Sequence, residues 1–154
     1  MTNQELTASQ RAEIAKAEQN ATRHGPADHV RQWLQDVHIA TFATLAVKAG
    51  IEGFPTNSVV PFALDKAGHP FVLIANIAAH TQNLKQDTRC SLFIREGDAG
   101  GDPQAQWRAT LVGFMERLIP EGTLTNSGLN SFDTTISINE YAELKARYLS
   151  LIHI

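Results

Sequence analysis

Three polar side chains that can bind an anion, His80, Thr81 and Asn83, lie close together in this 154-residue chain. An imidazole, a hydroxyl and an amide can each donate a hydrogen bond to a phosphate oxygen. They stand where the apolar segment Pro70–Asn76 gives way to a short polar segment typical of a helix. Because the first N–H groups of a helix are unpaired and carry a partial positive charge, a helix start favours anions. The cluster indicates a site for a phosphorylated cofactor; an ordinary helix start with Thr81 as N-cap is the alternative.

The segment that contains this cluster, Gly53–Ile94, alternates between strand-like runs and turn residues. Pro61 has no backbone donor, which predicts a sheet edge, a bulge or a face turned towards a ligand. The apolar runs and turns predict strands at Thr56–Leu64, Pro70–Asn76 and Cys90–Arg95, with a helix of one or two turns at Thr81–Gln86.

The rest of the chain predicts helices around further strands. Apolar residues at helical spacing (Val30, Trp33, Leu34, Val37) predict an amphipathic helix that begins at Ala27. Further elements are expected at Thr7–His24 (helix), Ile39–Val47 (strand), Trp107–Ile119 (long strand), Glu121–Thr135 (loop) and from the capping box Ser137–Glu140 onwards (helix with Ile138, Tyr141, Leu144 and Tyr148 buried). We therefore expect a mainly β, α+β protein: a small β-barrel with flanking helices outside it.

Composition excludes several classes of protein. The net charge of -3 and a pI near 6.0 disfavour a nucleic-acid partner, whose binding domains are usually basic. No apolar run approaches the roughly 20 residues that span a bilayer, so no membrane partner is expected. Cys90 is the single cysteine, and the histidines lack metal-ligand spacing, so we expect no disulfide within the chain and no protein metal site. The cytoplasm is the expected compartment.

The chain is predicted to contain three parts: a helical extension over residues 1–25, a barrel domain over 26–148 and a tail over 149–154. The tail reads Leu-Ser-Leu-Ile-His-Ile and has no helix C-cap. It matches a translation of a transposase-end adaptor used in sequencing libraries. We expect that the natural coding sequence departs from this one after Tyr148, and we exclude the tail from functional reasoning.

Several motifs between Ala27 and Leu118 together resemble a known superfamily. They are Ala43-Thr44-Leu45, Phe54-Pro55, Ser58-Val59-Val60-Pro61, Ala63-Leu64-Asp65, Gly68-His69-Pro70, His80-Thr81-Gln82-Asn83-Leu84, Asp87, Arg89, Ser91–Ile94, Asp102-Pro103, Arg108 and Thr110-Leu111-Val112-Gly113. This order resembles the FMN-binding split-barrel superfamily, named after pyridoxamine 5′-phosphate oxidase. The closest likeness is to its bacterial branch that includes heme-utilisation proteins.

The resemblance implies a split β-barrel that forms a homodimer, with FMN held between the subunits. It places Ser58, Val59 and Val60 near the flavin ring, and Ala75, His80, Thr81 and Asn83 near the ribityl phosphate. Trp107 and Arg108 would close the site, from the same or the partner subunit. Arg89 is a further candidate for the phosphate, or it pairs with Asp87.

The chain also departs from the oxidases of that superfamily. Ser58 stands where an arginine is expected, and no arginine-leucine-histidine motif follows near the end. We therefore do not expect vitamin B6 oxidation. No Ser-His-Asp set or carboxylate pair can be argued from spacing, so no catalytic residue is assigned, and any chemistry would belong to the cofactor.

Three functions remain open from the sequence. The main prediction is an FMN-dependent oxidoreductase that acts through the flavin on a small-molecule substrate. The alternative is a heme-binding or heme-degrading protein on the same barrel, which needs a histidine or cysteine iron ligand; His80 is the barrel histidine that we nominate. The third is a dimeric binding module without a cofactor.

Overall fold

The computed structural model describes residues 25–97, 102, 104–123 and 133–152. The chain divides into two compact units, Met1–Asp36 and Val37–Ile154. In the first unit, helix α2 (Pro26–Asp36) confirms the amphipathic helix expected there, and an Arg31–Asp28 ion pair of 2.7 Å crosses one of its turns. The helix predicted over Thr7–His24 lies outside the described residues.

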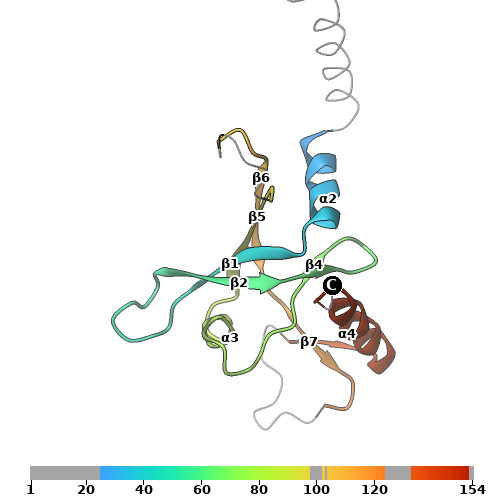
Figure 1. Ribbon diagram of the computed structural model, residues 1–154. Helices are drawn as coiled ribbons and strands as arrows, with labels where there is room; N and C mark the ends of the chain where they lie inside the picture. The colour runs from blue at the N-terminus through green and yellow to red at the C-terminus, as the bar shows by residue number, and fades with distance from the viewer. Residues whose placement is uncertain (1–24, 98–101, 103, 124–132, 153–154) are drawn as a thin grey trace, which may run out of the picture. The chain divides into compact units, whose positions relative to one another are not determined.

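The second unit is built on one antiparallel sheet of four strands (Figure 1). Its strand order is β2-β1-β5-β6, so β2 is an edge strand, as Pro61 predicts. The strands are β1 (Ile39–Leu45), β2 (Pro55–Pro61), β5 (Arg89–Arg95) and β6 (Arg108–Phe114).

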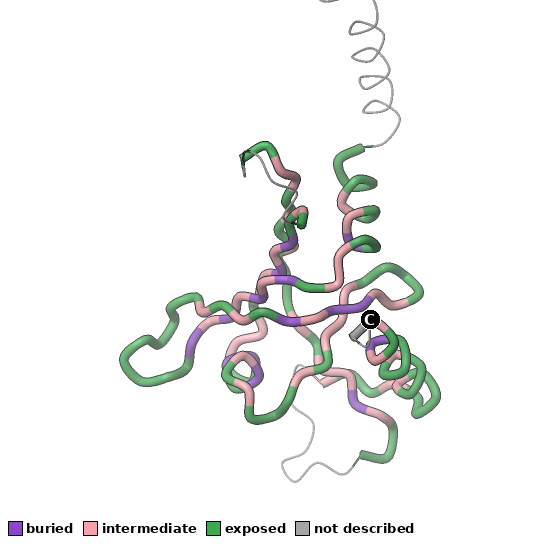
Figure 2. The backbone as a smooth tube through the Cα atoms, viewed as in Figure 1, coloured by how far each residue is buried: buried purple, intermediate pink, exposed green. Residues whose placement is uncertain are grey.

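The register of these strands gives the sheet two different faces. Phe42 of β1 lies opposite Ser58 of β2 and Leu92 of β5, and residues paired in this way point to the same side. We call this side, which carries the buried side chains of Phe42, Leu92 and Ile94, the inner face. The other side, which we call the outer face, carries the exposed side chains of Val59, Val112 and Phe114. Figure 2 colours each residue along the backbone by its burial.

Short elements complete the second unit. Two strands, β3 (Ala63–Leu64) and β4 (Pro70–Phe71), form a small hairpin, and helix α3 (Ala79–Leu84) follows it. Strands β7 (Arg117–Pro120) and β8 (Asp133–Ile136) pair in parallel, and a two-bond Arg117–Asp133 ion pair at 2.7 Å joins them. Helix α4 (Ile138–Ile152) ends the described chain.

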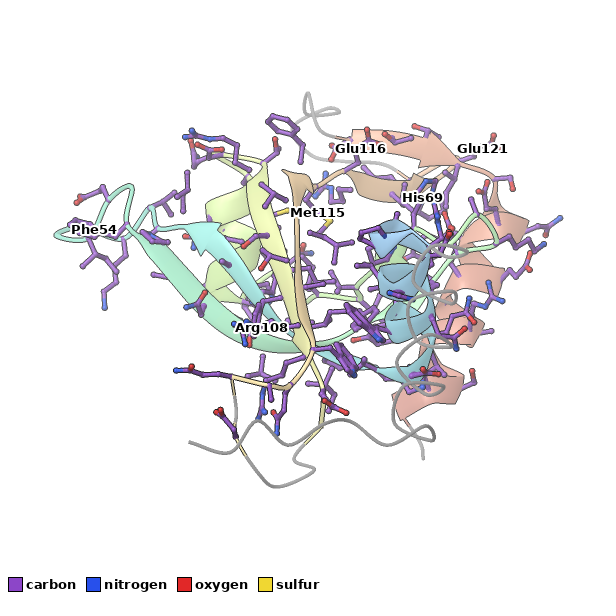
Figure 3. All side chains as sticks on the ribbon, turned by 90° about the horizontal axis from the view of Figure 1, so that it is seen from above. Phe54, His69, Arg108, Met115, Glu116 and Glu121 are labelled. Carbon is purple, nitrogen blue, oxygen red and sulfur yellow. The ribbon has the colours of Figure 1, made fainter. Side chains whose placement is uncertain are left out.

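Three predicted boundaries were wrong. The strand expected over Thr56–Leu64 is broken at Phe62: its N–H still donates to the His38 carbonyl opposite it, and Ala63 then begins β3, which pairs with β4. The strand expected over Pro70–Asn76 ends at Phe71. The strand expected over Trp107–Ile119 divides at Met115, whose N–H donates to the Thr88 carbonyl, before β7 joins another sheet (Figure 3).

The C-terminal segment from Glu121 onwards differs from its prediction in one strand and in the burial of one helix residue. The loop expected over Glu121–Thr135 contains most of β8, although residues 124–132 lie outside the described chain. The cap is confirmed, since Ser137 Oγ accepts from the Glu140 N–H at 3.2 Å. Ile138 is exposed rather than buried, whereas Tyr148 is buried and donates to the Pro61 carbonyl at 3.2 Å.

Helix α4 continues past Tyr148 to Ile152, into the segment predicted to be an artefactual tail. The helical geometry does not test where the natural coding sequence departs, so that expectation stays a prediction. Among the described residues, no helix is long and apolar enough to cross a bilayer. The mainly β, α+β architecture expected from the sequence is confirmed.

Candidate functional site

His80, in the first turn of α3, lies over the inner face of the sheet. Its Nδ1 is 3.1 Å from Ser58 Oγ on β2, and its ring meets Phe42 of β1 edge-on with centroids 6.0 Å apart. The side chain is half-buried. Burial lowers the pKa of His80, so the imidazole is neutral at pH 7. A neutral ring with Nδ1 engaged leaves Nε2 as the group available for a ligand.

Thr81 and Asn83, predicted to bind phosphate with His80, are instead tied into the fold. Thr81 is buried, and its hydroxyl donates to the Ala75 carbonyl at 2.7 Å. Asn83 is also buried, and its amide nitrogen donates to Thr44 Oγ1 at 2.9 Å and to Thr56 Oγ1 at 3.2 Å.

The amide oxygen of Asn83 also has a hydrogen-bond partner within the chain. Its Oδ1 accepts from the Val47 N–H at 3.1 Å. Every hydrogen-bonding atom of the amide therefore has a partner within the chain, and the Thr81 hydroxyl hydrogen is also used. Contact of these residues with a phosphate stays a prediction, but their donors already hold α3 against β1 and β2.

The three β2 residues predicted to lie near a flavin ring do not share a face. Ser58 and Val60 belong to the inner face, and Val60 is buried. Val59 points to the outer face and is 75% exposed. The strand alternation separates their side chains. Because β2 is an edge strand, part of its backbone remains available for a ligand.

The two arginines considered for the phosphate lie elsewhere. Arg108 pairs with Arg95 in the register of β6 with β5, on the outer face, so one chain does not bring it to His80 (Figure 3). Arg89 makes a bidentate ion pair with Asp87, with a shortest contact of 2.6 Å. This bond lowers the pKa of Asp87 to about 2 and confirms the alternative in which Arg89 pairs locally.

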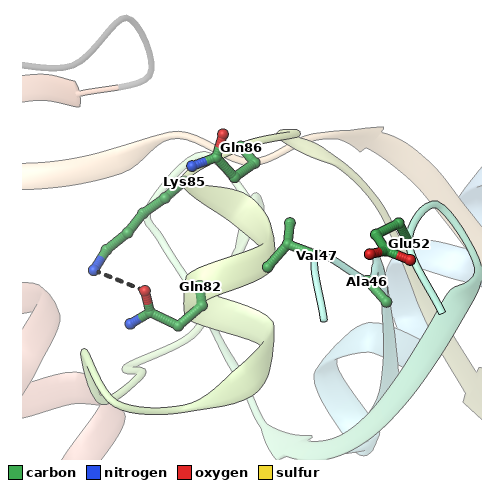
Figure 4. Close-up of a pocket in the computed structure, with 6 residues that line it drawn as sticks. All are labelled: Ala46, Val47, Glu52, Gln82, Lys85 and Gln86. Atoms are coloured by element: carbon green, nitrogen blue, oxygen red, sulfur yellow. Dashed lines mark hydrogen bonds between the residues drawn. The ribbon is translucent and has the colours of Figure 1, made fainter. Parts of the chain in front are cut away.

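A surface depression of about 540 Å³ lies on another side of α3. Ala46, Val47 and Glu52 form one wall, and Gln82, Lys85 and Gln86 form the other (Figure 4). None of the predicted site residues lines it. Its rim is polar, and the Lys85 ammonium group donates to Gln82 at 3.4 Å. The depression is therefore separate from the cluster around His80.

Sequence reasoning missed the partners that give the cluster its form. Thr44, Thr56 and Phe42 lie far along the chain from α3, yet they contact Asn83 and His80. Thr44 and Phe42 were visible only as members of a strand pattern. Period-two alternation from Ala40 to Thr44 could have placed both on the face that meets the helix.

Comparison with known proteins gives one family, one heme-related relative and two structures whose names refer to heme. The CREG β-barrel family model matches residues 21–128. A chloroplastic heme oxygenase, HOZ, from Arabidopsis thaliana is 34% identical over 81 residues, which is 53% of this chain and 25% of that protein. The chain therefore matches about a quarter of the length of this relative.

Solved structures with similar folds include two proteins whose names refer to heme. A heme binding protein from Mycobacterium smegmatis is 28% identical, with a TM-score of 0.58 over 78% of this chain and 40% of that one. HutZ, the heme storage protein from Vibrio cholerae, has a TM-score of 0.55 at 21% identity, over 81% of this chain and 77% of that one. The second likeness concerns the fold alone.

Proposed function

This chain belongs to the CREG β-barrel family, and we propose that it is a heme-binding member that takes part in heme degradation. Two observations from related proteins support this: the heme oxygenase relative, and the heme binding protein from Mycobacterium smegmatis. The proposal replaces the FMN-dependent oxidoreductase as the main interpretation and takes up the alternative that the sequence left open.

The proposal rests on one observation in this chain: the polar side chains of His80, Thr81 and Asn83 are already bonded to other residues of the fold. A phosphate site needs donors that are free to point outward. The side-chain donors of Thr81 and Asn83 point into the fold and are already bonded there. What remains at the cluster is a neutral imidazole beside an aromatic ring, a donor set that suits heme iron better than a phosphate ester.

The surroundings of His80 also fit an apolar macrocycle. Phe42 contacts its ring, and the preceding segment exposes Leu73 by 43% and Ile77 by 92%. Bound heme would supply a redox-active iron, whereas exposed apolar side chains such as Ile77 would cover the macrocycle and the fully buried Phe42 would hold the ring of the iron ligand. Cys90 is a poorer candidate ligand, because burial raises the pKa of its thiol and disfavours the thiolate.

We further propose that the chain forms a homodimer through the outer face of the sheet. Val59, Val112 and Phe114 are 75%, 82% and 78% exposed on that face, from strands at both edges. Exposed apolar side chains of this kind are typical of an interface, and here they share the face with the exposed Arg89, Arg95 and Arg108. A second copy of this chain presents the same residues and can cover them symmetrically. A cofactor at that interface stays a prediction.

The visible spectrum of the full-length protein tests the function. We expect colourless or heme-containing protein as isolated, and a saturable Soret band when hemin is added. FMN added in the same way should be removed by gel filtration. A yellow protein that retains FMN and takes up no hemin would return the account to the flavin interpretation. Protein that takes up neither would favour the binding module without a cofactor.

A further inference from the structure

We propose that His80 is the axial iron ligand through Nε2, and that Ser58 is the residue that positions its ring. This inference rests on the proposed function, because it names the group in this chain that would hold the heme iron. It goes further by assigning the atom, its partner on β2 and the order in which substitutions should weaken binding.

The His80 ring is held in a fixed orientation before any heme binds. Its Nδ1 lies 3.1 Å from Ser58 Oγ, and its ring packs edge-on against Phe42. Both partners come from the sheet, and Phe42 is fully buried. An imidazole anchored on two sides loses little conformational freedom when its other nitrogen binds a metal. The arrangement is therefore preorganised for a ligand at Nε2.

The position of the proton on the His80 ring also bears on this assignment. A serine hydroxyl can donate or accept, so the contact with Ser58 is compatible with either tautomer of His80. Iron binding at Nε2 requires the proton on Nδ1, which then donates to Ser58 Oγ. A hydrogen bond of this kind to the far nitrogen orients a metal-bound histidine and increases its basicity. The Ser58 hydroxyl oxygen can accept this hydrogen bond, so Ser58 has the right chemistry for the role.

A single histidine is enough to bind heme iron to the protein. Within the described part of the chain, no group of three or more His, Cys, Asp or Glu side chains is arranged to hold a metal ion. Heme iron needs no such group, because the macrocycle already provides four nitrogen ligands and the protein adds one axial ligand. The lack of a metal-binding cluster therefore does not conflict with a single anchored imidazole.

Another histidine, His69, provides a contrast. Its Nδ1 is also bound, 3.1 Å from Asp65 Oδ2, but its side chain is 78% exposed in the turn between β3 and β4. A heme bound there would have little apolar surface to cover it. His80 combines a held ring with half-burial and an aromatic neighbour, so the two histidines form a matched pair for a test.

Hemin binding to purified full-length variants provides the test. We expect His80→Ala to weaken hemin affinity more than 100-fold, beyond the range for a partner of a metal ligand, and to shift the Soret band and the EPR signal of the ferric complex. Ser58→Ala should keep the wild-type spectral type but weaken hemin binding by about 10- to 100-fold, the range for partners of metal ligands. His69→Ala should match the wild type in both readouts.

A variant that leaves a cavity in place of the imidazole distinguishes the loss of the iron ligand from misfolding of the protein. His80→Gly should lose the wild-type spectrum and regain it when imidazole is added, while its circular dichroism stays unchanged. If the wild type binds hemin and His80→Ala has the same spectrum and affinity, the assignment of His80 is wrong and the proposed function stands. If the wild type takes up no hemin, the proposed function itself fails.

Discussion

Side chains along the four-stranded sheet alternate between its two faces, and only the inner face carries mainly buried residues. On the inner face, α3 covers the strands, and Asn83 bonds to Thr44 and Thr56 while His80 contacts Phe42. On the outer face, Val112 and Phe114 stay exposed. The chain covers the inner face with its own residues, and under the proposed homodimer a second copy covers the outer face. Stability should therefore depend on the inner face, and assembly on the outer face.

The largest expected effect is on the inner face. Asn83→Ala removes the bonds to Thr44, Thr56 and the Val47 N–H and leaves these partners unsatisfied in or near the core. We expect a loss of about 2–4 kcal/mol in the free energy of unfolding, since each orphaned buried group costs about 1–3 kcal/mol. Urea denaturation measures it. Gln82→Ala, one residue away and exposed, is the control and should change stability little.

The outer face should respond in the opposite way. Val112→Glu places a charge in an exposed apolar patch, so it should leave folding nearly unchanged but weaken self-association at least tenfold, about 1.4 kcal/mol. Analytical ultracentrifugation over a range of concentrations measures this. Lys145→Glu, on exposed α4, should not alter assembly. A wild type that stays monomeric at all concentrations would remove the proposed dimer.

A smaller effect is expected where α4 joins the end of β2. Tyr148→Phe removes only the hydroxyl that donates to the Pro61 carbonyl at 3.2 Å. Because the ring stays buried, we expect a loss of about 1 kcal/mol in the free energy of unfolding. Thermal denaturation of Tyr148→Phe beside Tyr141→Phe checks it. Equal melting temperatures for the two variants would show that the bond contributes nothing.

The smallest effect concerns the exposed Asp87–Arg89 pair at the start of β5. The pKa of Asp87 is lowered from 3.8 to about 2, chiefly by the side-chain bond to Arg89. A depressed carboxyl pKa stabilises the fold above the unfolded value of 3.8, and that contribution is lost as the pH falls through about 2. Arg89→Leu should return the pKa of Asp87 towards 3.8, as an NMR titration would detect. A value that stays near 2 would assign the shift to the backbone.

The elements of the fold could be predicted where the local pattern is strong. The strand at Ile39, the helix after Gly25 and the Ser137 cap follow from spacing and capping chemistry. Strand ends could not be predicted, because distant partners set them: Phe62 and Met115 still bond to the residues opposite them, but the segments that follow pair with β4 and β8 instead. The parallel pairing of β7 with β8 has no local signal at all.

The polar cluster could be found from sequence, but the role of each member could not. His80, Thr81 and Asn83 have equal standing as a motif, yet two of them bond inward and one keeps a free ring nitrogen. Which way each of these side chains points depends on its contacts with Thr44, Ala75 and Ser58, and the sequence motifs do not show which residues pair in this way. The prediction of a phosphate cradle followed from treating three donors as equally available.

The ratio of hemin to FMN affinity tests the central claim most directly. Full-length protein is titrated with each cofactor separately under one buffer, by Soret absorbance for hemin and by quenching of flavin fluorescence for FMN. The account predicts saturable hemin binding, with one heme per chain and a dissociation constant at least 100-fold below that of FMN. An FMN dissociation constant equal to or below the hemin value would contradict it.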